Sequence, residues 1–179
     1  MIRSVNALLG RIVRALDEQF PKVEYASWRR CEELIPHAQA CATLIAQHQL
    51  IFPEVGDLLT KAGWYLREQE QYTQAAHILQ QALTIAERSL GSDHSYLGVI
   101  LNNLASLYQD QGRYEEAEPL LRRALTINEQ ALPPDHPHTA TTLENYASLL
   151  RELNRPREAQ PLEQHAQAMR ARLSSKSNK

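Results

Sequence analysis

The chain has 179 residues and a formal net charge of −2 at pH 7, with 19 basic and 21 acidic side chains. This length allows one domain with its own core or a short array of repeats, and the near balance of charge argues against a broad basic surface for nucleic acid or anionic membranes. No apolar run approaches the roughly 20 residues that a membrane span requires. Cys31 and Cys41 have no companion pair and form neither a disulfide framework nor a zinc motif, so we expect a reduced, cytoplasmic protein.

The N-terminal part, residues 1–53, predicts a helical leader. Apolar residues within Val5–Leu16 recur at helical spacing, and Phe20-Pro21 ends this helix because the residue before a proline is pushed out of the α-helical region. A second helical stretch covers about Tyr25–Gln49, where Pro36 is expected to divide or kink the helix.

From residue 54 onward the sequence repeats with a period of 42 residues. Small residues mark the repeat, for example Ala75, Ala117 and Ala159. A fixed period of this size is typical of stacked helical hairpins, in which each unit packs on its neighbours. Each unit is expected to contain a helix A, a tight turn and a helix B. The three hairpins are expected at about residues 54–93, 94–135 and 136–173.

The middle unit gives the clearest helix boundaries. Helix A is expected at about Ser95–Gln111 and helix B at about Tyr114–Ala131. The turn between them needs a left-handed residue, which Gly112 supplies. The same position holds Asn154 in the third unit, and asparagine tolerates this conformation. It holds Glu70 in the first unit, which predicts a less comfortable turn there.

The histidines between the hairpins have a structural explanation. Asp93-His94 and Asp135-His136 lie where the next helix begins, so the aspartates are candidate N-caps and helix capping explains the recurrent histidines. His136 and His138 could ligate a metal, but no further ligand lies nearby in the sequence. Motifs of zinc peptidases, serine hydrolases and phosphate-binding loops are missing, so we expect no enzymatic activity, no cofactor and no metal.

The third unit departs from the pattern in helix B. Glu163 occupies the position held by Leu79 and Leu121 in the other two units. An ionised carboxylate is rarely buried without a partner, so this face is expected to meet water as a polar terminal cap. Residues 174–179 are expected to form a disordered polar tail.

The middle unit also carries a family resemblance. The stretch from Leu101 to Ala140, LNNLASLYQDQGRYEEAEPLLRRALTINEQALPPDHPHTA, resembles the tetratricopeptide repeat in its long form, found in kinesin light chains and in many bacterial repeat proteins. The leader stretch from Phe20 to Ile45 resembles the helical segment that precedes such arrays in bacterial NB-ARC-type signalling ATPases. The resemblance implies an all-α fold, in which the leader packs onto a right-handed superhelical stack of three hairpins.

In this family the concave wall is made by helix A residues that do not face helix B. Carried onto this chain, the resemblance implies a peptide-binding groove lined by Lys61, Trp64, Arg67, Asn102, Asn103, Ser106, Asn145, Ser148 and Arg151. Asn103 and Asn145 matter most, because a side-chain amide can pair with both the N–H and the C=O of an extended peptide. An aromatic pocket near Trp64 would select side chains. The alternative is that these are merely solvated polar residues.

Two functions remain open on the sequence. The leading hypothesis is a scaffold or adaptor that binds a peptide or protein of unknown identity in the groove. The alternative is a self-association element of a larger signalling assembly, in which the apolar face of the leader and Met169/Leu173 pair between copies. Neither hypothesis involves nucleic acid or a membrane.

Overall fold

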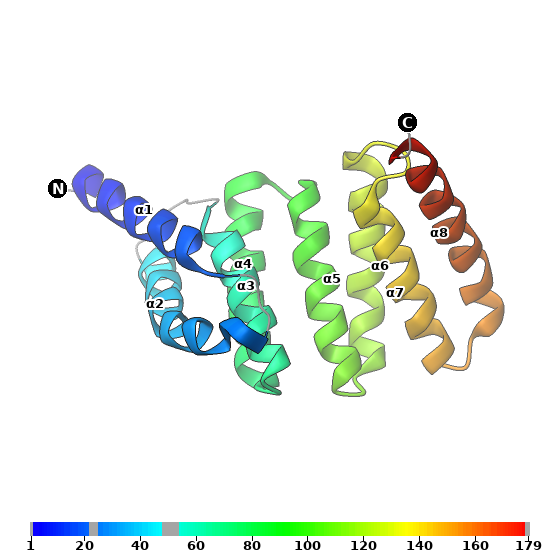
Figure 1. The fold of residues 1–179 in the computed structure, drawn as a ribbon, viewed down its shortest axis with the longest axis horizontal. Coiled ribbons are helices and arrows are strands. Elements are labelled where there is room, and N and C mark those ends of the chain that lie inside the picture. Colours follow the sequence, from blue (N-terminus) through cyan, green and yellow to red (C-terminus); the bar gives the residue numbers. More distant parts are fainter. Residues whose placement is uncertain (1, 22–24, 48–53, 178–179) are drawn as a thin grey trace. The chain divides into compact units, whose positions relative to one another are not determined.

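The structure is a computed structural model, described over residues 2–21, 25–47 and 54–177 (Figure 1). All regular structure in these residues is helical, which confirms the expected all-α class. The elements are α1 (Ile2–Gln19), the short 3-10 helix η1 (Tyr25–Ser27), α2 (Trp28–Gln47), α3 (Glu54–Glu68), α4 (Tyr72–Leu90), α5 (Ser95–Asp110), α6 (Tyr114–Ala131), α7 (Pro137–Glu152) and α8 (Pro156–Ser177). None of the described helices is long and apolar enough to cross a membrane.

The chain divides into two compact units, Met1–Ser92 and Asp93–Lys179. The first, called here the N-terminal unit, contains α1 to α4, and the second, the C-terminal unit, contains α5 to α8. The expected boundary between the leader and the first hairpin at residue 53 stays a prediction. The leader and the first hairpin form one unit because α1 and α2 both pack against α3, an arrangement visible in Figure 1.

Small residues bring the two helices of each hairpin together. Ala117 and Ala124 of α6 are fully buried, and Leu121 fills the space between them. In the C-terminal unit α6 also packs against α7, so the two hairpins of this unit share a continuous interior. Helix periodicity therefore predicted both the helices and the faces that they bury.

All three turns between helix A and helix B close in the same way. In the middle turn, the N–H of Arg113 donates to the carbonyl of Tyr108 at 2.8 Å, and the N–H of Gly112 donates to the carbonyl of Gln109 at 2.9 Å. This pair of bonds is the Schellman motif, which requires a left-handed residue. Gly112, Asn154 and Glu70 have φ angles of 70°, 57° and 57°, so the expected positions are confirmed.

Replacing Glu70 by glycine is expected to stabilise the N-terminal unit by about 1 kcal/mol, because glycine adopts a positive φ without the Cβ penalty. Glu70→Ala, which keeps a Cβ, is the matched control and should give no such gain. Both tryptophans, Trp28 and Trp64, belong to this unit, so tryptophan fluorescence during urea unfolding measures the effect. Equal stabilisation by glycine and alanine would contradict the explanation by backbone strain.

The connectors between hairpins correct one expectation. The N-cap residues of α5 and α7 are His94 and His136, not the preceding aspartates. In each case the imidazole Nδ1 accepts a hydrogen bond of 3.2 Å from the backbone N–H two residues on. Asp135 instead has a φ of 63° and pairs with Arg172 at 2.7 Å. Capping thus explains the recurrent histidines, as expected.

Two further expectations differ from the structure. α2 is one helix that includes Pro36, so the expected division is wrong, and the alternative of a kink stays a prediction. α8 extends to Ser177, so residues 174–177 are helical where a disordered tail was expected. In this last turn the hydroxyls of Ser174 and Ser175 donate to the carbonyls of Ala171 and Arg172 at 2.9 and 2.8 Å. Residues 178–179 lie outside the described part of the chain.

Candidate functional site

The C-terminal unit brings six of the nine predicted groove residues onto two packed helices. Asn102, Asn103 and Ser106 lie on α5, and Asn145, Ser148 and Arg151 lie on α7. The side chains of Asn145 and Asn102 meet, since the Asn145 Nδ2 donates a hydrogen bond of 3.2 Å to the Asn102 Oδ1. We call the surface formed by these six residues the α5–α7 face.

The polar groups of this face differ in how much bonding capacity they keep. Asn103 is half-buried, and its amide makes no hydrogen bond with a described residue. Asn145 uses one N–H on Asn102, which leaves its second N–H and its carbonyl oxygen available. Ser148 is exposed and Ser106 half-buried. The face can therefore offer both donors and acceptors to a ligand.

Arg151 is engaged within the protein. Its guanidinium pairs with Glu163 of α8, with 2.6 Å between Nη2 and Oε2. The hydrogen bond from Arg151 lowers the pKa of the Glu163 carboxyl. Glu163 keeps its exposure to solvent, as the sequence predicted, and is in addition paired with Arg151. The surface around this pair is polar, with Gln160, Gln164 and Gln167 nearby.

The N-terminal unit holds the other three predicted residues, all on α3. Lys61 is held by α1, since its Nζ lies 2.7 Å from the Asp17 carboxylate and 3.2 Å from the Asp17 carbonyl oxygen. Trp64 is 49% exposed. Arg67 is half-buried and makes an interaction of its own within the chain. The single groove expected across all three hairpins stays a prediction.

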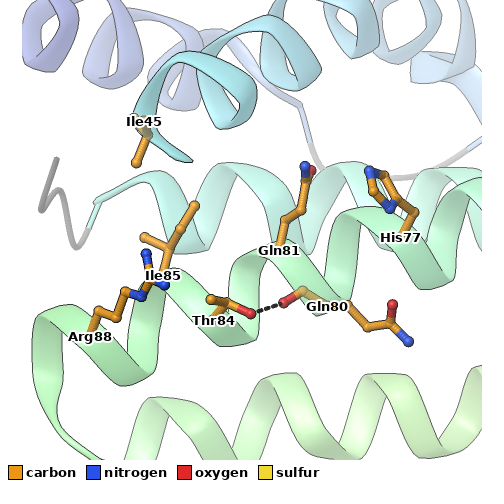
Figure 2. Close-up of a pocket in the computed structure, with 7 residues that line it drawn as sticks. All are labelled: Ile45, His77, Gln80, Gln81, Thr84, Ile85 and Arg88. Carbon is orange, nitrogen blue, oxygen red and sulfur yellow. Dashed lines mark hydrogen bonds between the residues drawn. The ribbon is translucent and has the colours of Figure 1, made fainter. Parts of the chain in front are cut away.

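Figure 2 shows a pocket that sequence reasoning missed. It lies between the end of α2 and one side of α4, entirely within the N-terminal unit. Ile45 and Ile85 form its apolar part, and the other lining residues are His77, Gln80, Gln81, Thr84 and Arg88. Among the described residues that line it, none is a carboxylate or a thiol. No sequence signal pointed to it, because α2 lies outside the obvious repeats.

The two surfaces predicted for self-association differ in exposure. Met169 is 4% exposed and packs in a cluster with Ala140, Leu143 and Ala166, whereas Leu173 is half-buried. On the leader, Leu8, Ile12 and Leu44 are exposed. Self-association stays a prediction. In the described part of the chain, no three His, Cys, Asp or Glu side chains are placed to hold a metal ion.

Comparison with known proteins supports the resemblance seen in the sequence. The family model described as tetratricopeptide repeat matches residues 54–130 and 96–172. No curated protein matches the chain. The resemblance of the stretch from Phe20 to Ile45 to NB-ARC-type ATPases stays a prediction.

Several solved structures are similar to this chain in fold. A putative kinesin light chain of Podosopora anserina with nearly identical TPR-like repeats has a TM-score of 0.62 and 19% identity, and the match covers 96% of this chain and 88% of that one. A substituted variant of that protein has a TM-score of 0.64 and 18% identity, over 97% and 89% of the two chains. BtubC (BKLC) from P. vanneervenii has a TM-score of 0.72 and 18% identity, over 84% of this chain and 60% of that one.

Proposed function

We propose, because this chain belongs to the tetratricopeptide repeat family, that its α5–α7 face binds an extended segment of a partner protein. Tetratricopeptide repeats generally mediate protein–protein interactions, and their arrays offer extended binding surfaces rather than catalytic centres. The observation that carries the proposal is the amide arrangement, in which Asn145 contacts Asn102 at 3.2 Å. Asn103 follows Asn102 in the sequence, is half-buried, and has an amide that no described residue uses.

The binding mechanism would rely on the ligand backbone. An asparagine side chain can donate to a peptide carbonyl and accept from a peptide N–H at the same time. Asn103 can do both, and Asn145 retains one N–H and its carbonyl oxygen beyond the bond to Asn102. Such contacts give affinity with little demand on ligand sequence, and they favour an extended segment because a helical one has already paired its backbone groups. Ser106 and Ser148 would add single hydroxyl contacts.

On this proposal the chain is a scaffold or adaptor without enzymatic activity. All nine predicted residues are candidates for ligand contact, and Lys61, Trp64 and Arg67 on α3 form the corresponding face of the N-terminal unit. Cys31 and Cys41 are free and buried, which suits a reducing compartment such as the cytoplasm.

The test uses peptides selected on the wild-type chain from a displayed library of random sequences. For the selected peptides, the double variant Asn103→Ala, Asn145→Ala is expected to raise Kd about tenfold, because each lost hydrogen bond is worth about 0.5–1.5 kcal/mol. Fluorescence anisotropy with labelled peptides measures Kd. Gln130→Ala is the matched control, since it removes an exposed amide from α6 of the same unit. An unchanged Kd in a double variant that melts like the wild type would refute the proposal.

A further inference from the structure

The leader contacts α3 at a position that the repeat also uses for a contact between successive helices A. Lys61 occupies the same repeat position as Asn145, two periods later. Asn145 of α7 bonds to Asn102 of α5, the helix A before it. Lys61 of α3 bonds in the same way to Asp17 of α1. Both bonds therefore join the same repeat position to an earlier helix, although α1 and α2 pack much less closely against each other than the two helices of a hairpin.

The burial pattern of α2 resembles that of α4. Every buried residue of α4 has a buried counterpart 44 residues earlier in α2. The counterparts are Cys31, Leu34, Ile35, Ala38, Cys41 and Ala42 for Ala75, Ile78, Leu79, Ala82, Ile85 and Ala86. α2 thus has the buried face of a helix B. The Podosopora anserina repeat structures align over almost the whole chain, leader included.

The ion pair between Lys61 and Asp17 makes the exposed side of α3 more acidic. Asp57, Lys61, Trp64 and Glu68 follow one another at spacings of three and four residues, so they share one side of the helix. Lys61 is neutralised by Asp17. Asp57 and Glu68 are exposed on either side of Trp64, which is itself 49% exposed. Trp64 therefore has one carboxylate about one turn after it, at Glu68, and a second about two turns before it, at Asp57.

We propose that this side of α3 receives an arginine or lysine side chain of a partner protein, stacked on Trp64 and flanked by Asp57 and Glu68. The inference rests on the proposed function, because α3 is the helix A of the first hairpin. A cation over the face of an indole is attracted by the negative ring face, and tryptophan is the best aromatic partner for it. Carboxylates on both sides add charge complementarity, which sets specificity more than affinity.

The cationic side chains near Trp64 do not remove the preference for a basic ligand residue. Arg67, one turn further along α3, is half-buried and already engaged within the chain. Arg14 of α1 is exposed but likewise has an interaction of its own. Glu18, next to Asp17, adds a further exposed carboxylate on α1. An acidic ligand residue would meet net repulsion here, and an aliphatic one would leave the carboxylates without partners.

The experiment uses the same displayed random library with the full chain as bait. We expect the enriched peptides to share an arginine or lysine, and replacement of that residue by leucine should raise Kd on the wild type at least fivefold. On the triple variant Asp57→Asn, Trp64→Leu, Glu68→Gln, the same replacement should leave Kd nearly unchanged. The control variant, Glu115→Gln with Glu129→Gln, loses two exposed acids from α6 instead. On this control, the replacement of the peptide's basic residue by leucine should still raise Kd at least fivefold.

Each outcome decides between the two proposals. If the enriched peptides share no basic residue, or if the leucine replacement acts equally on wild type and triple variant, the α3 inference falls. If those peptides still weaken with Asn103→Ala, Asn145→Ala, the proposed function survives this failure. If no peptide is enriched at all, both proposals fall. Variants are compared only when their helical circular dichroism and melting temperature match the wild type.

Discussion

Replacing Gly98 by alanine is expected to lower the free energy of unfolding of the C-terminal unit by about 2 kcal/mol, although alanine is the better helix former by about 1 kcal/mol. A Cβ on residue 98 would overlap with the Oδ1 of Asn128 and lie 2.9 Å from its Cγ. Asn128 is 1% exposed, and its Nδ2 donates to the Thr142 hydroxyl at 3.1 Å. The amide cannot turn away without losing that bond, so the added methyl group forces α5 and α6 apart.

The measurement is urea unfolding followed by helical circular dichroism, because both tryptophans lie in the N-terminal unit. A double-mutant cycle with Asn128→Ala isolates the contact: the truncated side chain makes room, so Gly98→Ala should cost much less in that background. In the third unit these two positions hold Ala140 and Arg170, which shows that the repeat itself does not demand glycine. Equal costs in both backgrounds would contradict the contact as the cause.

The middle hairpin shows what the sequence could predict. Its helix B was expected at Tyr114–Ala131 and is found there, and helix A ends one residue earlier than expected. This accuracy has a physical reason, since a fixed period, a buried alanine face and a left-handed turn residue all indicate the same boundaries. The same period places the left-handed position of the first turn at Glu70. Its φ of 57° confirms the positive φ expected of a non-glycine residue there.

The candidate site was less predictable because it depends on contacts between distant residues. Lys61 pairs with Asp17 across 44 residues, and no periodic signal links them. Arg151 looked available on its helix, yet Glu163 of α8 holds it. The histidine N-caps were missed because aspartate is the more common N-cap residue. The sequence therefore predicted which helix face carries polar residues, whereas the structure decided which of these groups are already paired.

Glu118 provides the strongest polar link between the two hairpins of the C-terminal unit. From α6, its carboxylate accepts hydrogen bonds from Arg155 at 2.7 Å, from Arg122 at 2.8 Å and from the Tyr146 hydroxyl at 3.2 Å. Its side chain is only 15% exposed. The same repeat position holds Ala76 and Gln160 in the other units, so no repeat pattern could have predicted it.

Replacing Glu118 by alanine is expected to cost about 2 kcal/mol of unfolding free energy, because three bonds to a mostly buried carboxylate are lost together. Urea unfolding followed by circular dichroism measures this. Glu116→Gln is the matched control, since that carboxylate is exposed and pairs only locally with Arg113. Its removal should leave unfolding nearly unchanged, as is typical of surface pairs. An equal loss in both variants would mean that the link between hairpins contributes nothing specific.

The pH dependence of Glu118→Gln tests the charge itself. Burial raises the pKa of Glu118, but the hydrogen bond and charge of Arg155, with Tyr146 and Arg122, outweigh burial and hold the pKa below its ordinary value. A carboxyl with a lowered pKa in the folded state stabilises the fold above its unfolded pKa of about 4.3. This contribution disappears as the pH falls through the folded pKa, because the unfolded chain takes up its proton first. The stability difference between wild type and Glu118→Gln should therefore be full at pH 7 and shrink as the pH falls through the lowered pKa of the folded state. The other acids cancel in this comparison, so a difference that stays constant with pH would show that shape and packing, not charge, give Glu118 its effect.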